Sequence, residues 1–203
     1  MSTIRTAAPG DGTSVARLYA IAMGTDDAPD PTSPMIQAIE GNGGLVPVPF
    51  GTAHCIVAEA EGDVVGMIHA APPVQWLQDL PGSRAKALAH RILQVELLAV
   101  DAGSRGAGLG QRLLEAVEAR VRDQQGYLVI GKVRAGDFTA MRYYRRRGYI
   151  IAGKREPVVF QTTKGGENIT VLDDEFHLFA KAVQPGTALH RDRSMNCIYL
   201  VAE

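Results

Sequence analysis

A glycine-rich turn between a strand pattern and a helix pattern, in residues 97–126, constrains the fold of this chain most. The apolar run at 91–100 predicts a strand, and the residues after the turn predict an amphipathic helix. The turn itself places Gly106, Gly108 and Gly110 at every second position, so its backbone carries few Cβ atoms and can approach a ligand closely. The apolar side of the helix is formed by Leu109, Leu113, Leu114, Val117 and Val121.

The start of this helix favours an anionic ligand. The first N–H groups of a helix have no intrahelical partner, and the helix dipole adds partial positive charge at the same place. A phosphate or pyrophosphate would fit, although a plain strand-to-helix connection with three glycines is an equal alternative. The run is not G-x-G-x-x-G, because Gln111 stands three residues after Gly108, and no Gly-Lys-Ser/Thr of a P-loop follows.

The regions on either side of the turn predict a mixed α and β domain. A second apolar run at 127–133 predicts a buried strand, so the unit from 91 to 133 implies parallel pairing through a right-handed crossover. Residues 54–60 and 64–70 form a β-hairpin pattern. Further strands are predicted at 3–6, 149–151, 157–163, 169–172, 176–183 and 197–201, with a proline-containing loop at 45–51 and a long loop at 71–90. Further helices are predicted after a cap at Asp11, Thr13 or Ser14, after a cap at Ser33 and at 138–147, and Gly126 is predicted as the C-cap of the helix that follows the turn.

Length and composition narrow the class of protein. The 203 residues suit one domain, 1–203, with no internal repeat or linker. The formal net charge is −1, which gives no sign of nucleic-acid or membrane binding. The separated Cys55 and Cys197 predict reduced core residues rather than a disulfide or metal site. Because the sequence shows neither a signal peptide pattern nor a long apolar stretch, we expect a cytoplasmic protein.

The turn resembles a known coenzyme-binding motif. Residues 105–110 form an R/Q-x-x-G-x-G/A run directly after the predicted strand, similar to the coenzyme A-binding motif of the GCN5-related N-acetyltransferase (GNAT) superfamily. The resemblance implies that the end of the strand holds the pantetheine arm and acetyl group, through Leu98, Ala99 and Val100. It also implies that the pyrophosphate is bound by the backbone N–H groups of Arg105, Gly106, Ala107, Gly108, Leu109 and Gly110.

The resemblance also implies a fold. It predicts an α+β domain with a central, mostly antiparallel sheet, a parallel and splayed central strand pair, and flanking helices. Residues 91–149 would be the coenzyme A-binding core, with 184–203 as a C-terminal extension. Acetyl-CoA is the implied cosubstrate, without a metal. Apart from the resemblance, the extension is also a candidate for homodimer formation, by strand exchange or by continuation of the sheet.

A second segment, residues 137–149, resembles the N-x-x-A-x-x-x-Y-x-x-x-G-F/Y segment of the same superfamily. The match carries Tyr144 onto the position of the general acid, with Tyr143 as the weaker choice. Asp137 replaces the usual asparagine, so it can cap the helix but lacks an amide donor. The basic run Arg142, Arg145, Arg146 and Arg147 is either a solvated helix face or a neutraliser of a phosphorylated ligand.

Acetyl transfer to an amine also needs a base, since an alkyl ammonium is a poor nucleophile. Glu96 is the candidate, because the two-residue period of a strand puts it on one face with Leu98 and Val100. A structural or substrate-orienting role for Glu96 is equally open. A backbone N–H near Leu98 could hold the thioester oxygen.

The leading hypothesis is an acetyl-CoA-dependent N-acetyltransferase in which a primary amine of a small molecule or peptide attacks the thioester directly in a ternary complex. The alternatives are a non-catalytic acyl-CoA-binding or sensing module and a binder of another nucleotide phosphate. The sequence leaves the acceptor open. An acidic loop with Asp26, Asp27 and Asp30 is either solvated or attracts a cationic amine, and the segment 71–90 either binds a ligand or covers the sheet.

Overall fold

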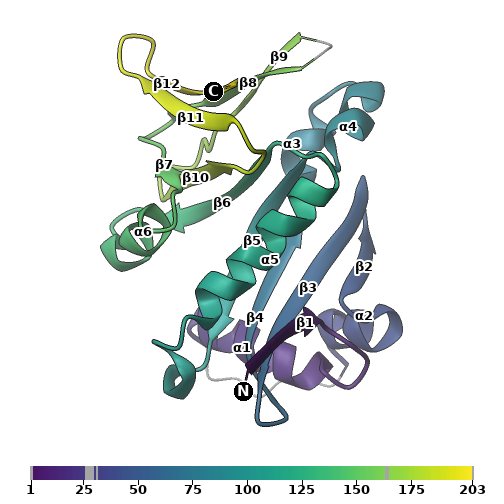
Figure 1. The fold of residues 1–203 in the computed structure, drawn as a ribbon. Helices are drawn as coiled ribbons and strands as arrows, with labels where there is room; N and C mark the ends of the chain where they lie inside the picture. Colours follow the sequence, from purple (N-terminus) through teal and green to yellow (C-terminus); the bar gives the residue numbers. More distant parts are fainter. Residues whose placement is uncertain (1, 26–29, 31, 163–164, 203) are drawn as a thin grey trace. The chain divides into compact units, whose positions relative to one another are not determined.

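The computed structural model describes residues 2–25, 30, 32–162 and 165–202. The chain forms two compact units, each made from two stretches: Met1–Pro72 with Val95–Glu118, and Pro73–Gln94 with Ala119–Glu203 (Figure 1). Strand β5 (Ile92–Val100) and helix α5 (Leu109–Asp123) each run from one unit into the other. None of the helices in the described part of the chain is long and apolar enough to span a membrane.

The first unit is built on a sheet with the strand order β1-β3-β4-β5, and β2 also pairs with β3. The hairpin predicted at 54–60 and 64–70 is confirmed: β3 and β4 pair antiparallel, with a bulge between Ala58 and Glu59. Glu61 and Gly62 form its turn with positive φ angles of 56° and 93°. The strands are β1 (Ser2–Thr6), β2 (Leu45–Val48), β3 (Gly51–Ala60) and β4 (Asp63–Ala71).

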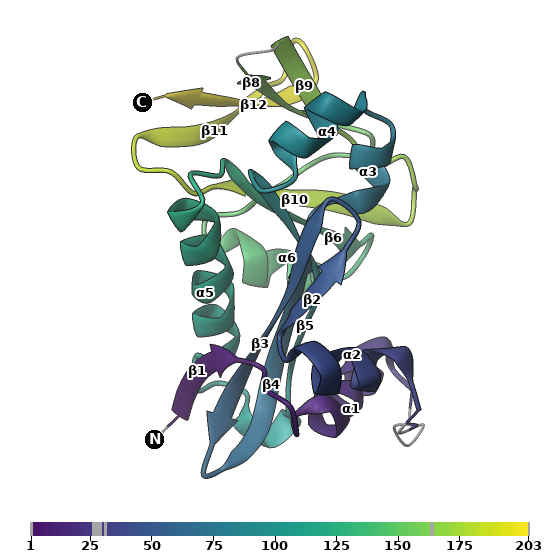
Figure 2. The same cartoon turned by 90° about the vertical axis from the view of Figure 1, so that its right-hand side faces the viewer.

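Helices cover both faces of this sheet. Helices α1 (Gly12–Met23) and α2 (Pro34–Asn42) lie on one face, and the first part of α5 lies on the other (Figure 2). The predicted cap of α2 is confirmed, because the Ser33 hydroxyl accepts from the Ile36 N–H at 3.3 Å. The core between the sheet and α1 and α2 consists of Ala7, Val15, Leu18, Ile39, Cys55, Val57, Val64, Met67 and Ala99.

The second unit contains two sheets. In the first, the strand order β5-β6-β10-β7 begins with the parallel pair β5 and β6 and continues with antiparallel pairs. The Tyr127 N–H donates to the Arg91 carbonyl at 2.6 Å where β5 and β6 begin. Helix α6 (Phe138–Arg145) follows β6 along the chain. The remaining strands of this sheet are β6 (Leu128–Arg134), β7 (Ile150–Ile151) and β10 (Phe176–Ala182).

The other sheet of this unit has the order β11-β12-β8-β9, with β8 and β12 parallel. Helices α3 (Val74–Gln78) and α4 (Gly82–Leu88) pack beside it. The Trp76 indole donates to the Asn168 carbonyl at 2.9 Å, and Arg84 lies 2.5 Å from the buried carboxylate of Glu167. The strands are β8 (Val158–Thr162), β9 (Gly165–Ile169), β11 (Thr187–Asp192) and β12 (Cys197–Ala202).

Several sequence predictions of secondary structure are wrong in detail. The segment 71–90, predicted as a loop, contains α3 and α4, which are too short to show a helical period, and each follows a proline at its N-cap. Strand β2 lies in the segment 45–51, which was predicted to be a proline-containing loop. Strand β9 ends at Ile169, where the predicted strand 169–172 begins, and β11 was missed. Leu172 is exposed, so its apolar character misled the prediction.

The C-terminal extension predicted at 184–203 forms β11 and β12, which pair with each other. Strand β12 also pairs with β8 of the same chain. The extension is therefore part of the second sheet of its unit. Homodimer formation through this segment stays a prediction.

The start of α1 is closed by charged groups that are distant in sequence. Asp11 was a candidate cap, but its carboxylate accepts from Arg5 at 2.6 and 3.1 Å and from the Ala8 N–H at 2.8 Å. Glu40 of α2 instead accepts from the N–H groups of Gly10 and Gly12, at 2.7 and 3.0 Å. The hydrogen bonds from the Arg5 guanidinium lower the pKa of Asp11 against the opposing effect of burial.

This lowered pKa predicts a pH-dependent contribution to stability. A carboxylate whose pKa is depressed on folding stabilises the fold above its unfolded pKa, and the contribution is lost as the pH falls through the folded value. We therefore expect Asp11→Asn to lower the free energy of unfolding by about 1–2 kcal/mol at pH 7. The difference from the wild type should be smaller at pH 3, which lies below the unfolded pKa of about 3.9, and it is lost as the pH falls further through the folded value. Urea titrations at both pH values would measure it.

The matched control for this prediction is Asp79→Asn. Asp79 is exposed and has no ion pair among the described residues, so its substitution should change stability by less than about 0.5 kcal/mol. Equal effects of Asp11→Asn and Asp79→Asn at pH 7 would contradict the role given to the Arg5 pair.

Candidate functional site

Two glycines of the glycine-rich turn adopt a left-handed backbone conformation, which other residues rarely adopt. After the short 3-10 helix η1 (Ala102–Ser104), Gly106 and Gly108 adopt φ angles of 86° and 77°, in the left-handed region that L side chains avoid. Both are exposed, and a Cβ built on either would meet nothing within 4 Å. The two glycines therefore shape the backbone while leaving open space beside it.

Helix α5 begins directly after this turn. The Arg112 N–H donates to the Gly108 carbonyl at 3.1 Å, which is the hydrogen bond of the first turn. The N–H groups of Leu109 and Gly110 precede it, so they have no carbonyl within the helix to bind. Leu109 is 3% exposed and fixes this end of the helix in the core. The arrangement fits an anionic group such as a pyrophosphate at the helix start.

An ion pair holds the beginning of the turn. Asp101 follows β5, and its carboxylate accepts from both terminal nitrogens of Arg17 in α1, at 2.6 and 2.9 Å. Arg17 also donates to the Val64 carbonyl at 3.2 Å, and the Asp101 N–H donates to the Val65 carbonyl at 2.9 Å. The middle of the turn is tied back to the end of β5 by Arg105, whose Nε donates to the Val100 carbonyl at 3.1 Å.

The strand β5 presents two different faces in the first unit. Leu97 and Ala99 pack against the core under α1 and α2. Glu96 is exposed, and Leu98 and Val100 are half-buried, on the opposite face. The structure thus agrees with the shared face of Glu96, Leu98 and Val100. The role of Glu96 as a base stays a prediction.

Helix α6 positions the predicted acid in the second unit. Asp137 caps this helix as predicted, since its carboxylate accepts from the Ala140 N–H at 2.9 Å. The Tyr144 ring stacks on Phe179 of β10 with centroids 3.9 Å apart and planes at 19°, and it meets Tyr149 edge-on at 5.7 Å. The ring is therefore held by aromatic contacts on two sides.

This packing changes the acidity of the phenol. Burial raises the pKa of Tyr144 above its usual value of 10, and the neighbouring Tyr143 and Asp137 raise it further against the opposing effect of Arg147. Tyr144 consequently stays protonated at neutral pH. Tyr143 has a different setting, because the Arg147 guanidinium lies over its ring at 3.5 Å.

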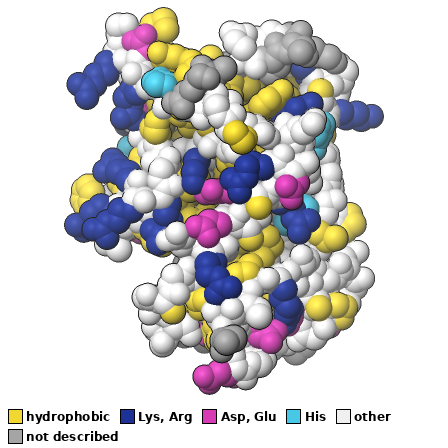
Figure 3. Space-filling view, in the orientation of Figure 1, with side chains coloured by type: hydrophobic (Ala, Val, Ile, Leu, Met, Phe, Trp, Pro, Cys, Tyr) yellow, Lys and Arg dark blue, Asp and Glu magenta, His cyan; other side chains and the backbone are white. Residues whose placement is uncertain are grey.

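The predicted site residues fall into two groups in the structure. Glu96, Leu98–Val100 and Arg105–Gly110 belong to the first unit, whereas Asp137 and Tyr144 belong to the second. Asp26 and Asp27 lie outside the described residues, and Asp30 is exposed. Lys and Arg side chains gather over α6 (Figure 3). The basic run within 142–147 divides: Arg147, just after α6, packs on Tyr143, and Arg145 lines a pocket of the second unit.

Within residues 2–25, 30, 32–162 and 165–202, no three His, Cys, Asp or Glu side chains are grouped to hold a metal ion. Cys55 and Cys197 are buried free thiols, and burial raises the pKa of Cys55 to about 12. Burial also lowers the pKa of His69, so its imidazole is neutral at pH 7.

Comparison with known proteins points to one family. A sequence profile described as the Acetyltransferase (GNAT) family matches residues 15–149. The Blasticidin-S acetyltransferase of Streptomyces morookaense is 43% identical over 74 residues, which are 36% of this chain and 54% of that protein. The match thus spans about half the length of this curated relative.

Solved structures show the same fold at low sequence identity. The yncA protein of Salmonella typhimurium, solved with its cofactor acetyl-CoA, superimposes with a TM-score of 0.59 at 16% identity, over 91% of this chain and 95% of that one. The ribosomal-protein-S18-alanine N-acetyltransferase of Escherichia coli gives a TM-score of 0.57 at 16% identity, over 91% and 95% of the two chains.

The left-handed backbone of the turn leads to a testable expectation. Replacing Gly108 by alanine forces a Cβ into a conformation that costs about 1–2 kcal/mol. We expect Gly108→Ala to distort the turn and to weaken coenzyme A binding by about tenfold or more, as measured by calorimetry. Gly103→Ala is the matched control, because Gly103 lies in the same segment without a positive φ and with open space around it. Equal coenzyme A affinity in both variants would contradict the assignment of the turn.

Proposed function

Because the chain belongs to the acetyltransferase (GNAT) family, we propose that it transfers the acetyl group of acetyl-CoA to a primary amine of a small molecule or peptide. The observation that carries this proposal is the turn at Gly106 and Gly108, with its left-handed backbone and the free N–H groups of α5 behind it. A turn of this kind supports binding of the coenzyme pyrophosphate.

Two parts of the coenzyme, the pyrophosphate and the pantetheine arm, have candidate partners in this chain. The N–H groups of residues 105–110 would bind the pyrophosphate, and the half-buried Leu98 and Val100 would lie along the pantetheine arm with Ala99 behind them. Asp137 offers only acceptors and is engaged in its helix cap, so it would not donate a hydrogen bond to the coenzyme.

The carboxylate of Glu96 is the proposed base. Acetyl-CoA supplies an activated thioester, and the amine must lose a proton to attack its carbonyl carbon. Glu96 is exposed on the strand face shared with Leu98, so its carboxylate is accessible to an acceptor directly or through a water molecule. A backbone N–H near Leu98 would donate to the thioester oxygen as negative charge develops there.

The phenol of Tyr144 is the proposed acid. Cleavage of the thioester leaves a thiolate, which takes a proton on its sulfur as it departs. The raised pKa of Tyr144 keeps its hydroxyl protonated across the neutral range, so the proton is available at any physiological pH. The stack on Phe179 holds the ring in one orientation, which favours a defined path for this proton.

The acceptor is an amine of a type that the family leaves open. Blasticidin S is one acceptor to test, because the name of the Streptomyces relative gives it as the substrate of that enzyme. Polyamines, amino acids and peptide N-termini complete the panel. Release of coenzyme A with a single acceptor class would define the substrate.

If Tyr144 is the acid, removing its hydroxyl should lower kcat without changing the affinity for coenzyme A. Tyr144→Phe keeps the aromatic stack but removes the hydroxyl, so we expect kcat to fall by roughly 10²-fold while coenzyme A affinity changes less than about twofold. Steady-state kinetics and calorimetry would measure the two quantities. Tyr143→Phe is the matched control on the preceding residue. A kcat loss that is equal in both variants, or absent from both, would remove Tyr144 as the acid.

The assigned base predicts a loss of activity on removal of its carboxylate. We expect Glu96→Gln to lower kcat/KM by roughly 10²-fold, because the amide cannot accept the proton of the attacking amine. The exposed Glu61→Gln is the control, since Glu61 lies in the β3–β4 turn. A kcat/KM of Glu96→Gln equal to that of Glu61→Gln would remove Glu96 as the base. Tight acetyl-CoA binding without transfer to any amine would instead favour a non-catalytic acyl-CoA-binding module.

A further inference from the structure

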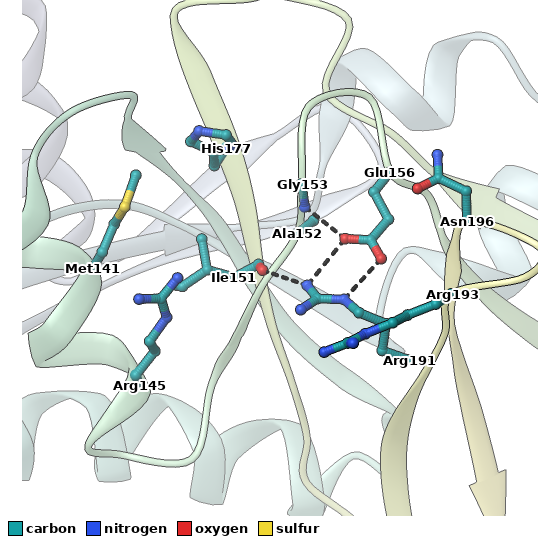
Figure 4. Close-up of a pocket in the computed structure, with 10 residues that line it drawn as sticks. All are labelled: Met141, Arg145, Ile151, Ala152, Gly153, Glu156, His177, Arg191, Arg193 and Asn196. Atoms are coloured by element: carbon teal, nitrogen blue, oxygen red, sulfur yellow. Dashed lines mark hydrogen bonds and ion pairs between the residues drawn. The ribbon is translucent and has the colours of Figure 1, made fainter.

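The second unit contains a pocket of about 390 Å³ whose walls come from four segments (Figure 4). These are α6, the segment after β7, the start of β10, and the end of β11 with the turn after it. A volume of this size is typical of a site for a small molecule. The pocket is lined by Met141, Arg145, Ile151, Ala152, Gly153, Glu156, His177, Arg191, Arg193 and Asn196.

The charged groups of this pocket are unbalanced. Three guanidinium groups, those of Arg145, Arg191 and Arg193, line it with a single carboxylate, that of Glu156. The lining therefore carries an excess of two positive charges, although the whole chain has a net charge of −1. Like charges in one pocket repel each other, and a bound anion would relieve this repulsion.

The single carboxylate is already fully engaged. Glu156 accepts from Arg191 through both oxygens, at 2.8 and 3.0 Å, and from the Gly153 N–H at 2.5 Å. Arg191 also donates to the Ile151 carbonyl at 2.6 Å. Figure 4 shows these contacts as one connected group that joins Arg191 of β11 to β7 and the segment after it. Glu156 and Arg191 therefore form a fixed wall, and Glu156 has little capacity to neutralise the other arginines.

The other two arginines remain available. Within the described part of the chain, neither Arg145 nor Arg193 has an ion pair or a side-chain hydrogen bond. Both are exposed at the pocket. Asp192 is adjacent to Arg193 in sequence, but its carboxylate accepts from Ser194 and Met195. Two free guanidinium groups at one pocket are suited to carboxylate or phosphate oxygens, which they bind in a bidentate manner.

The remaining wall is apolar. Met141, Ile151 and Ala152 are buried at 5%, 6% and 3% exposure and line the same pocket as the arginines. A hydrated inorganic ion would gain nothing from this surface, whereas a short carbon chain would cover it. The combination favours an organic ligand with a small apolar body.

We propose that this pocket binds a small organic dianion, in which two carboxylates or one phosphate monoester are carried on a short carbon body. The anionic oxygens contact Arg145 and Arg193, and the carbon body lies against Met141, Ile151 and Ala152. The pocket shares no lining residue with the proposed coenzyme A and acetyl-transfer residues. It is therefore a second binding site, and it does not depend on the proposed acetyl transfer.

Calorimetry on the full chain at low ionic strength tests the site directly. The probes are succinate and glycerol 3-phosphate, with succinamide, glycerol and inorganic phosphate as comparisons. We expect both dianions to bind with one site per chain, the uncharged analogues not to bind, and inorganic phosphate to bind at least fivefold more weakly. Comparison of the two dianions distinguishes a dicarboxylate from a phosphate monoester as the preferred class.

Variants separate this pocket from other cationic surfaces. Arg145→Gln/Arg193→Gln should weaken binding of the better probe at least tenfold. The control Arg134→Gln/Arg146→Gln removes the same charge from exposed arginines of the same unit outside the pocket, and it should change the affinity less than twofold. Saturation with coenzyme A should leave the probe affinity unchanged.

Three results would overturn the proposal. The first is no binding of either dianion to the wild type. The second is equal weakening in the two double variants, which would assign the effect to general charge. The third is displacement of the probe by coenzyme A together with full affinity in Arg145→Gln/Arg193→Gln, which would place the probe at the glycine-rich turn.

Discussion

The glycine-rich turn depends on how closely α5 approaches the sheet of the first unit. Gly66 of β4 makes this approach feasible, because a Cβ there would lie only 3.3 Å from the Ala99 carbonyl oxygen and 3.4 Å from Leu113 Cδ1. Leu113 is fully buried in this contact. The segment 101–108 joins the end of β5 to the start of α5. The packing of α5 on the sheet therefore fixes the positions of both ends of the turn. Arg17 and Asp101 then fix its first residue.

The features of this arrangement that depend on residues close together in the sequence were predictable. The helical period of α5, the two-residue alternation of the β3–β4 hairpin and the caps at Ser33 and Asp137 are all local signals, and the structure agrees with them. The parts that depend on distant partners were not. Glu40 closes the start of α1 from 28 residues away, and nothing near Asp11 in the sequence indicates this.

The same distinction applies to single glycines. Gly126 was predicted to end α5 by a left-handed conformation, but the positive φ, 55°, belongs to Gln125. Glycine is required at 126 for another reason, since a Cβ there would lie 2.5 Å from Val121 Cγ1 and 2.8 Å from the Arg91 carbonyl oxygen. The sequence thus indicated that glycine is required at position 126. Only the packing shows that the small size of the residue, and not its backbone angle, is the reason.

Tyr144 shows how far a motif can specify a functional residue. Its position follows from the spacing in 137–149, but its ring stacks on Phe179, which lies on a strand 35 residues later and belongs to no motif. Burial in this stack favours the neutral phenol. The role proposed for Tyr144 therefore follows from local sequence, while the raised pKa of its phenol follows from tertiary packing.

Helix α6 connects the two proposed sites through adjacent residues. Successive side chains on a helix point about 100° apart, so Tyr144 and Arg145 face different surroundings. Tyr144 packs against β10, and Arg145 lines the cationic pocket. The basic run on this helix, read from the sequence as one face, therefore serves separate purposes residue by residue. Because Met141 lines the pocket from the same helix, a ligand there would contact the element that holds the proposed acid.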